Sequence, residues 1–202
     1  NKTTDKRIQD HRRALVCKLF SIKGERLMDV LFISPNNNKK IYQDLSKDYA
    51  AIEPPTWSLL LAESCRSIGH DVGILDTNAE NLSDEESIDR IKDLNPRLLC
   101  FVVYGQNVNA GTVNMSGAVR LSDAIKYQGI ETPICFVGSH VSALPIETLK
   151  KEKSIDIILT NEGVYALRNI LSCNLRDISA LENIKGIGFI KDGEPFLTPA
   201  EK

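Results

Sequence analysis

Four short segments rich in amides, hydroxyls and glycine are the places where this chain could bind a polar ligand. They lie at residues 34–38, 104–107, 138–142 and 160–163. Glycine lets the backbone approach a ligand closely, and asparagine, glutamine and serine supply neutral hydrogen-bond donors and acceptors. Such segments suit a large, polar, weakly charged ligand, although the same residues are also the ordinary material of loops.

Acid–base catalysis is a second chemistry that these segments could support. His140 and Glu162 each follow an expected strand and could act as an acid and a base at one edge of a sheet. Ser139 beside His140 would need a third orienting group to act as a nucleophile, and the sequence identifies none. A G-x-S-x-G elbow and the phosphate-binding glycine motifs are both missing after the expected strands. His140 is therefore interpreted first as a loop or pocket-wall residue.

The five cysteines argue against metal and disulfide chemistry. Neighbouring cysteines are at least 35 positions apart, so no C-x-x-C pair exists for zinc, and the odd, scattered set does not form a disulfide framework. Cys100 and Cys135 lie inside apolar runs, where free cysteine usually packs as a small hydrophobe. We expect both in the core.

Composition favours one globular domain that binds neither nucleic acid nor membrane. The chain has 202 residues, of which 42% are hydrophobic and 26% charged, and its 25 basic and 27 acidic residues give a net charge of −2. A nucleic-acid-binding protein normally carries a basic field. Apolar runs stop at about seven residues, far below the roughly 20 that span a bilayer, and no signal peptide opens the chain. We expect a cytoplasmic protein.

The chemistry-bearing segments need a scaffold, and the hydrophobic pattern predicts one. Buried-strand patterns alternate with helical patterns, which is typical of an α/β fold with a doubly wound, Rossmann-like or flavodoxin-like sheet. We expect a mainly parallel sheet of about five strands with helices on both faces, a C-terminal hairpin, and an N-terminal arm or extension over 1–27 before a domain over 28–202. The expected strands are 28–34, 71–76, 98–104, 134–137 and 155–159, the helices 57–68, 84–94, 113–127, 145–149 and 162–171, and the hairpin 186–197.

Two further residues near the expected ligand edge receive structural interpretations. Asp76 ends the second expected strand and is interpreted as a turn former, because no glycine fingerprint for a dinucleotide accompanies it. Trp57 opens the first expected helix and is interpreted as a core or helix-packing residue in preference to a stacking platform. In a doubly wound sheet the ligand sits outside the carboxyl ends of the strands, so the loops that follow each strand carry the function.

Taken together, four motifs resemble the amino-terminal cobalamin-binding domain of radical S-adenosylmethionine enzymes. They read EPPTWSLLLA, GHDVGILD, GSHVSALP and NEG, and their order and spacing match that family over 28–197. Three differences stand out: Thr56 and Trp57 replace a residue and the glycine of P-P-x-G-L, Ser139 replaces a second glycine, and Asn161 replaces the first glycine of G-E-G.

The resemblance implies a corrinoid, cobalamin, lying over the carboxyl edge of the sheet. The His of the D-x-H-x-x-G motif is missing after the first strand, so the resemblance implies cobalt without a His ligand from that motif, and no metal-ligating or catalytic residue is assigned. The implied cofactor-binding residues are Ser34, Asn36, Thr56, Tyr104, Gly105, Gln106, Asn107, Gly138, Ser139, His140, Ser142, Asn161, Glu162 and Gly163.

The C-x-x-x-C-x-x-C triplet that holds a [4Fe-4S] cluster in this family is missing from the chain. The resemblance therefore implies a module that holds the methyl carrier for a radical domain in cis, with the cluster and S-adenosylmethionine bound there, in a methyltransferase-like enzyme. Two alternatives stay open. One is a vestigial scaffold or interaction domain that binds no cofactor, and the other is a small enzyme that acts through His140 and Glu162.

Overall fold

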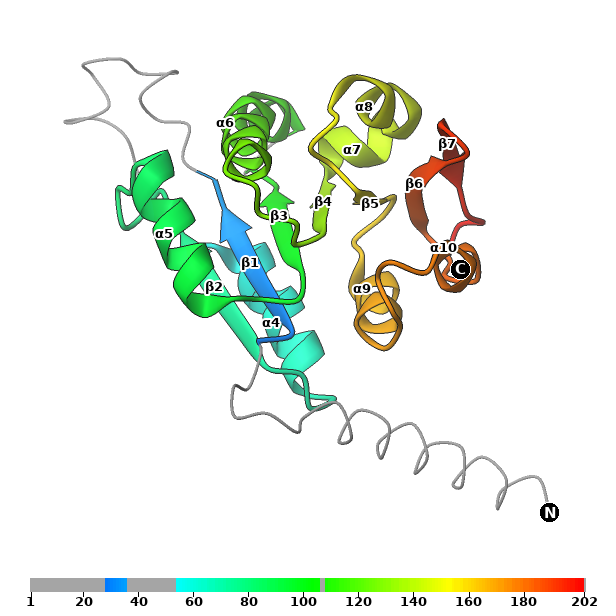
Figure 1. Ribbon diagram of the computed structural model, residues 1–202, viewed down its shortest axis with the longest axis horizontal. Helices are drawn as coiled ribbons and strands as arrows, with labels where there is room; N and C mark the ends of the chain where they lie inside the picture. The colour runs from blue at the N-terminus through cyan, green and yellow to red at the C-terminus, as the bar shows by residue number, and fades with distance from the viewer. Residues whose placement is uncertain (1–27, 36–53, 106–107, 202) are drawn as a thin grey trace.

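A computed structural model of the chain describes residues 28–35, 54–105 and 108–201. Seven strands form one sheet in the order β2-β1-β3-β4-β5-β6-β7 (Figure 1). The strands β1 to β5 are parallel, and β6 and β7 add an antiparallel hairpin to the same sheet. The strands are β1 (Val30–Ser34), β2 (Val72–Asp76), β3 (Leu99–Val103), β4 (Ile134–Gly138), β5 (Ile157–Leu159), β6 (Ile187–Lys191) and β7 (Glu194–Leu197).

Helices cover both faces of this sheet, which confirms the doubly wound α/β fold expected from the sequence. One buried cluster joins α4, α9 and the region of α10 to one face, and a second joins α5, α6, α7 and α8 to the other. The helices are α4 (Thr56–Arg66), α5 (Asp84–Leu94), α6 (Val108–Tyr127), α7 (Ser139–Ala143), α8 (Pro145–Lys151), α9 (Val164–Leu171) and α10 (Ile178–Glu182).

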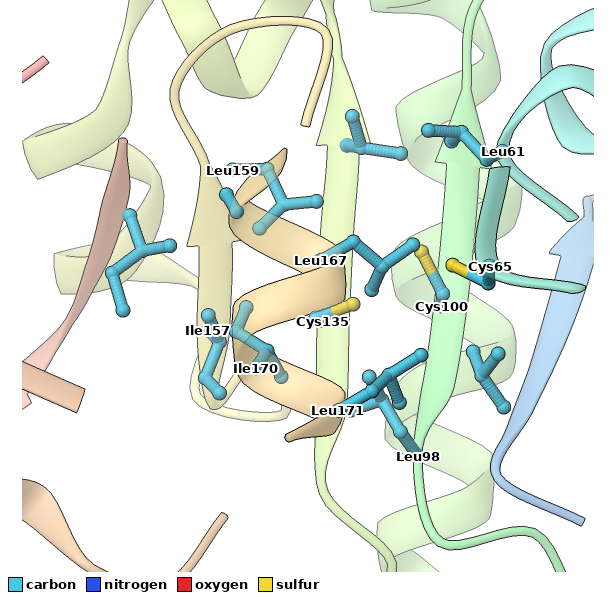
Figure 2. Close-up of a cluster of buried hydrophobic side chains, with 14 of the residues drawn as sticks. Leu61, Cys65, Leu98, Cys100, Cys135, Ile157, Leu159, Leu167, Ile170 and Leu171 are labelled. Atoms are coloured by element: carbon cyan, nitrogen blue, oxygen red, sulfur yellow. The ribbon is translucent and has the colours of Figure 1, made fainter. Parts of the chain in front are cut away.

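Three cysteines lie in the core between the sheet and helices α4 and α9 (Figure 2). Cys100 and Cys135 pair in register on β3 and β4, and both are fully buried, as expected. Cys65 of α4 points toward them in Figure 2. Burial raises the pKa of the Cys65 thiol to about 11, and a hydrogen bond with Cys135 together with burial raises the pKa of Cys100. These thiols therefore pack as neutral groups.

Local sequence signals explain why several elements begin and end where they do. Ser83 and Glu86 form a capping box at the start of α5: the Ser83 hydroxyl accepts from the Glu86 N–H, and the Glu86 carboxylate accepts from the Ser83 N–H. Asn95 then ends the helix in the left-handed conformation. The β6–β7 hairpin turns through Asp192 and Gly193, both with positive φ, as two-residue hairpins require.

Most element ends lie within two residues of the expected ones, and three differences are larger. Residues 139–142, expected as part of a loop, belong to helix α7, which runs over Ser139–Ala143. Helix α6 begins five residues earlier than predicted, and α10 was not predicted. Helix α7 has no side-chain cap, but its Val141 is fully buried in the core on the α6 side of the sheet. This short helix therefore depends on tertiary packing, which local sequence does not reveal.

A charged cluster ties together the amino ends of β1, β2 and β3, opposite the expected ligand edge. The Asp29 carboxylate accepts hydrogen bonds from the Asp71 backbone N–H at 2.9 Å and from Arg97 Nη1 at 2.8 Å. Nδ1 of His70 lies 3.4 Å from the same carboxylate. Burial acts to raise the pKa of Asp29, but these hydrogen bonds, with that from His70 the largest, outweigh it and lower the pKa to about 2.

The Asp29 cluster predicts that the free energy of unfolding decreases in acid. Because the folded pKa of about 2 lies below the ordinary value of 3.8, the stabilisation is fully present above about pH 4 and is lost as the pH falls through about 2. We expect Asp29→Asn to lower the free energy of unfolding by about 1–2 kcal/mol at pH 7, allowing for solvent screening. Urea unfolding between pH 7 and pH 2.5 should show this difference shrinking in acid.

Glu63→Gln is the matched control, because the Glu63–Arg66 pair is largely exposed on α4. Its stability should stay within about 0.5 kcal/mol of the unaltered chain at both ends of the pH range. An Asp29→Asn difference that is the same at pH 7 and pH 2.5 would contradict the assignment of the low pKa to this cluster.

Candidate functional site

The topological switch point of the sheet lies between β1 and β3. From β1 the chain passes to β2 on one side and then returns to β3 on the other, so the connections leave the sheet in opposite directions. Ligands of doubly wound sheets bind outside the carboxyl ends of the strands at this point. Ser34 ends β1 and Tyr104 directly follows β3, so the structure places both at the switch point.

The first turn of α4 closes one side of the switch point. The hydroxyls of Ser34 and Ser58 are hydrogen-bonded at 3.0 Å, which ties α4 to the end of β1. Trp57 stacks on Tyr104 with ring centroids 4.6 Å apart and an interplanar angle of 25°, which ties α4 to the end of β3. Trp57 is 40% exposed, so of the two expected roles the core placement is wrong, and the packing of the helix holds through the contact with Tyr104. Thr56 is exposed at the start of the same helix.

Tyr104 presents a neutral phenol at this edge. Burial, followed by the negative charge of Glu162, raises the pKa of its phenol to about 12. The phenol therefore keeps its proton at physiological pH and can donate a hydrogen bond. Asn114 of α6 donates from Nδ2 to the Tyr104 carbonyl at 3.2 Å, which fixes the backbone just before Gly105. The turn after β5 lies at the same edge as the end of β3, because β3, β4 and β5 are parallel neighbours in the sheet.

The end of β4 is packed too tightly for a side chain at Gly138. A Cβ there would overlap the carbonyl oxygen of Val103 on β3 and lie 2.8 Å from its carbonyl carbon. Ser139, His140 and Ser142 follow in α7, all half-buried. A Cβ on Gly111 of α6 would overlap the Ser139 hydroxyl, so α6 and α7 approach closely beside the site.

The turn after β5 uses its side chains mainly to fix the backbone. Oδ1 of Asn161 accepts from the Gly163 N–H at 3.1 Å, and Gly163 adopts a φ of 75° at the N-cap of α9. Glu162 between them is exposed. Among the residues described, no hydrogen bond or ion pair joins Glu162 to His140. The geometry therefore gives the acid–base alternative no support.

The structure brings most of the implied contact residues to one edge. Ser34, Tyr104 and Gly105 lie at the switch point, Thr56 opens α4 beside it, and the residues of α7 and of the turn after β5 continue the row. Asn36, Gln106 and Asn107 lie outside the described residues. Whether these side chains contact a ligand stays a prediction.

Sequence reasoning missed two residues that shape this edge. Ser58 and Asn114 lie inside helical patterns, and each acts on the site through a hydrogen bond to a residue at a strand end, 24 and 10 positions away in sequence. No local signal could have found either. Asp76, in contrast, accepts from the N–H groups of Asn78 and Ala79, which confirms its interpretation as a turn former.

Neither a metal cluster nor a membrane span is found in the part of the chain that the structure describes. Over 28–35, 54–105 and 108–201, no three His, Cys, Asp or Glu side chains gather so that they could hold a metal ion. No helix in those ranges is long and apolar enough to cross a bilayer.

A family model for the B12 binding domain matches residues 44–171, which includes α4, the strand ends from β2 to β5 and Tyr104 on the β3 side of the switch point. This chain belongs to the B12-binding domain family. The edge fits the cobalamin that such a domain is named for, because Tyr104 and Ser142 offer neutral hydroxyls. A comparison with curated proteins gave no match.

Solved structures similar to this B12-binding domain include two of TsrM, a radical S-adenosylmethionine methyltransferase from Kitasatospora setae. The structure with cobalamin and a [4Fe-4S] cluster bound has a TM-score of 0.65 and 14% identity, and the match covers 88% of this chain and 30% of TsrM. The structure with tryptophan substrate and a SAM analog has a TM-score of 0.62 and 15% identity, over 84% and 30%. At these identities the likeness shows the fold, and the chain spans about a third of the TsrM length.

Proposed function

We propose that this domain holds cobalamin over the carboxyl ends of β1, β3, β4 and β5, as the methyl carrier of a radical S-adenosylmethionine methyltransferase. The observation that carries the proposal is the B12-binding family match over residues 44–171, which contains α4 and the carboxyl ends of β3, β4 and β5. The mainly uncharged polar side chains of the edge support it, because corrinoids carry many uncharged amide side chains. When bound, cobalamin would supply a cobalt atom that accepts and donates a methyl group.

The residues of this chain bind and orient the corrinoid in this proposal. Gly138 lets the ends of β3 and β4 pack closely below the ligand, the Tyr104 phenol donates a hydrogen bond, and the half-buried Ser139, His140 and Ser142 line the β4 side. Residues 34–53 after β1 contain no histidine, so the cobalt would have no ligand of the D-x-H-x-x-G kind. The contacts also include Ser34, Asn36, Thr56, Gly105, Gln106, Asn107, Asn161, Glu162 and Gly163.

The radical step belongs to a further domain in the same protein. The cysteines of this chain do not contain the triplet for a [4Fe-4S] cluster. The matched TsrM structures support the arrangement, because this chain corresponds to about a third of TsrM and one of those structures holds cobalamin together with the cluster. We assign residues 28–202 to the cobalamin domain and 1–27 to an N-terminal arm or extension.

Titration of the purified 202-residue chain with hydroxocobalamin tests the proposal. We expect a saturable change in the visible spectrum of the corrinoid, and corrinoid that co-elutes with the protein on gel filtration. The same titration in urea that unfolds the chain is the control, because the edge exists only in the folded sheet. Failure of the folded chain to retain any corrinoid would favour the vestigial scaffold instead.

A further inference from the structure

The only tryptophan of the chain is half of a preformed aromatic stack at the switch point. The resemblance to cobalamin domains puts a glycine where Trp57 stands, so this indole is a feature of this chain. One indole face lies against Tyr104, with centroids 4.6 Å apart, while 40% of the Trp57 surface remains exposed to solvent. An exposed indole that is already fixed by stacking offers a rigid surface for a flat ligand.

The polar atoms of this stack are free to bind a ligand. Within the described residues, neither the indole N–H of Trp57 nor the hydroxyl of Tyr104 makes a hydrogen bond. The phenol stays protonated because its pKa is raised to about 12. The stack therefore combines an aromatic surface with two unpaired donors, a combination that suits a flat ring surrounded by amides.

The stack also lies where the ligand of this fold binds. Trp57 is in the first turn of α4, and the neighbouring Ser58 is hydrogen-bonded to Ser34 at the end of β1. Tyr104 follows the last residue of β3. The stack thus spans the two strand ends of the switch point, and its position is fixed by contacts that exist without any ligand. Such preorganisation reduces the entropy lost on binding.

We propose that the Trp57–Tyr104 stack is an aromatic platform on which the corrin ring packs, with the indole N–H and the phenol binding amides at the rim of the ring. This inference rests on the proposed function and deepens it. We assign the corrin ring to the stack in preference to the nucleotide tail, because the stack is at the sheet edge over which the ring would lie.

Two Trp57 variants and two corrinoids test the platform. We expect Trp57→Leu to weaken binding of both cyanocobalamin and dicyanocobinamide, which lacks the nucleotide tail, by roughly three- to tenfold. Trp57→Phe keeps an aromatic face and should stay within about twofold of the unaltered chain. Tyr127→Leu is the matched control, because Tyr127 is 91% exposed at the far end of α6, and its affinity should not change.

Three other results of this experiment would contradict the inference, each for a different reason. A loss with cyanocobalamin alone means that the stack contacts the nucleotide tail, and this overturns the inference. Unchanged or tighter binding by Trp57→Leu, with unfolding in urea near that of the unaltered chain, means that the stack only packs α4 or obstructs the edge. Failure of the unaltered chain to bind either corrinoid overturns the proposed function and the platform together.

Discussion

Replacing Gly138 by alanine is expected to lower the free energy of unfolding by about 3 kcal/mol or more. The added methyl group would overlap the carbonyl oxygen of Val103, which belongs to the paired backbone of β3. A flexible side chain could move away, but a strand in the centre of a seven-stranded sheet cannot without breaking its pairing. Because Gly138 leads directly into α7, corrinoid binding should fall as well. Urea unfolding and the hydroxocobalamin titration measure the two effects.

Gly129→Ala is the control for this substitution. Gly129 ends α6 with a positive φ of 74°, but no atom lies within 4 Å of an added Cβ. The backbone strain alone should cost about 1 kcal/mol. If the two variants proved equally stable, the close approach between β3 and β4 would not be the reason for glycine at position 138.

Much of the fold could be predicted because its determinants are local. Residues 98–104 are apolar on both faces, which only a sheet covered on both sides requires, and β3 is indeed fully buried. The acidic start at Asp84 predicted α5 with the bounds that the structure gives. Gly129 predicted the end of a helix, and the Asp192–Gly193 pair predicted a hairpin. Both signals are local, because the positive φ of these residues is a property of their own backbone.

The candidate site was less predictable because its geometry comes from contacts between distant residues. The residues near Trp57 in sequence do not predict that its ring stacks on Tyr104. That partner is 47 positions away, and the pairing of β3 with β1 brings it close. The same holds for the Ser34–Ser58 hydrogen bond. Periodicity placed Trp57 on a helix correctly, but it left open whether the ring lies in the core or packs the helix from outside.

The motifs that carry the family resemblance have two different physical roles. His70, from GHDVGILD, lies with Asp29 at the amino ends of the strands, opposite the switch point. Gly138 and Gly163 come from the other motifs and lie at the carboxyl ends, where a ligand binds. A residue in a motif shared with cobalamin domains therefore need not contact cobalamin. The His70 motif instead helps to hold the amino ends of β1, β2 and β3 together.

Replacing Phe136 by alanine is expected to cost about 3–5 kcal/mol, because it removes a large ring from the centre of the core. Phe136 stacks on Phe101 with centroids 4.8 Å apart, and both side chains are fully buried on the α6 side of the sheet. The remaining cavity would adjoin Phe101, which would lose its partner. Thermal and urea unfolding measure the loss, and Tyr127→Ala, at an exposed position, should change stability by less than about 0.5 kcal/mol.

Phe136→Ala also separates the stability of the sheet from the corrinoid site. The Phe136 side chain lies on the α6 side, whereas Trp57 and Tyr104 stack on the α4 side at the carboxyl edge. We therefore expect the folded fraction of this variant to keep its corrinoid affinity at low temperature within about twofold, in contrast to Trp57→Leu, which should lose affinity and keep most of its stability. A matching loss of affinity in both variants would mean that the platform depends on the whole core and is not fixed by the contacts of α4 with β1 and β3.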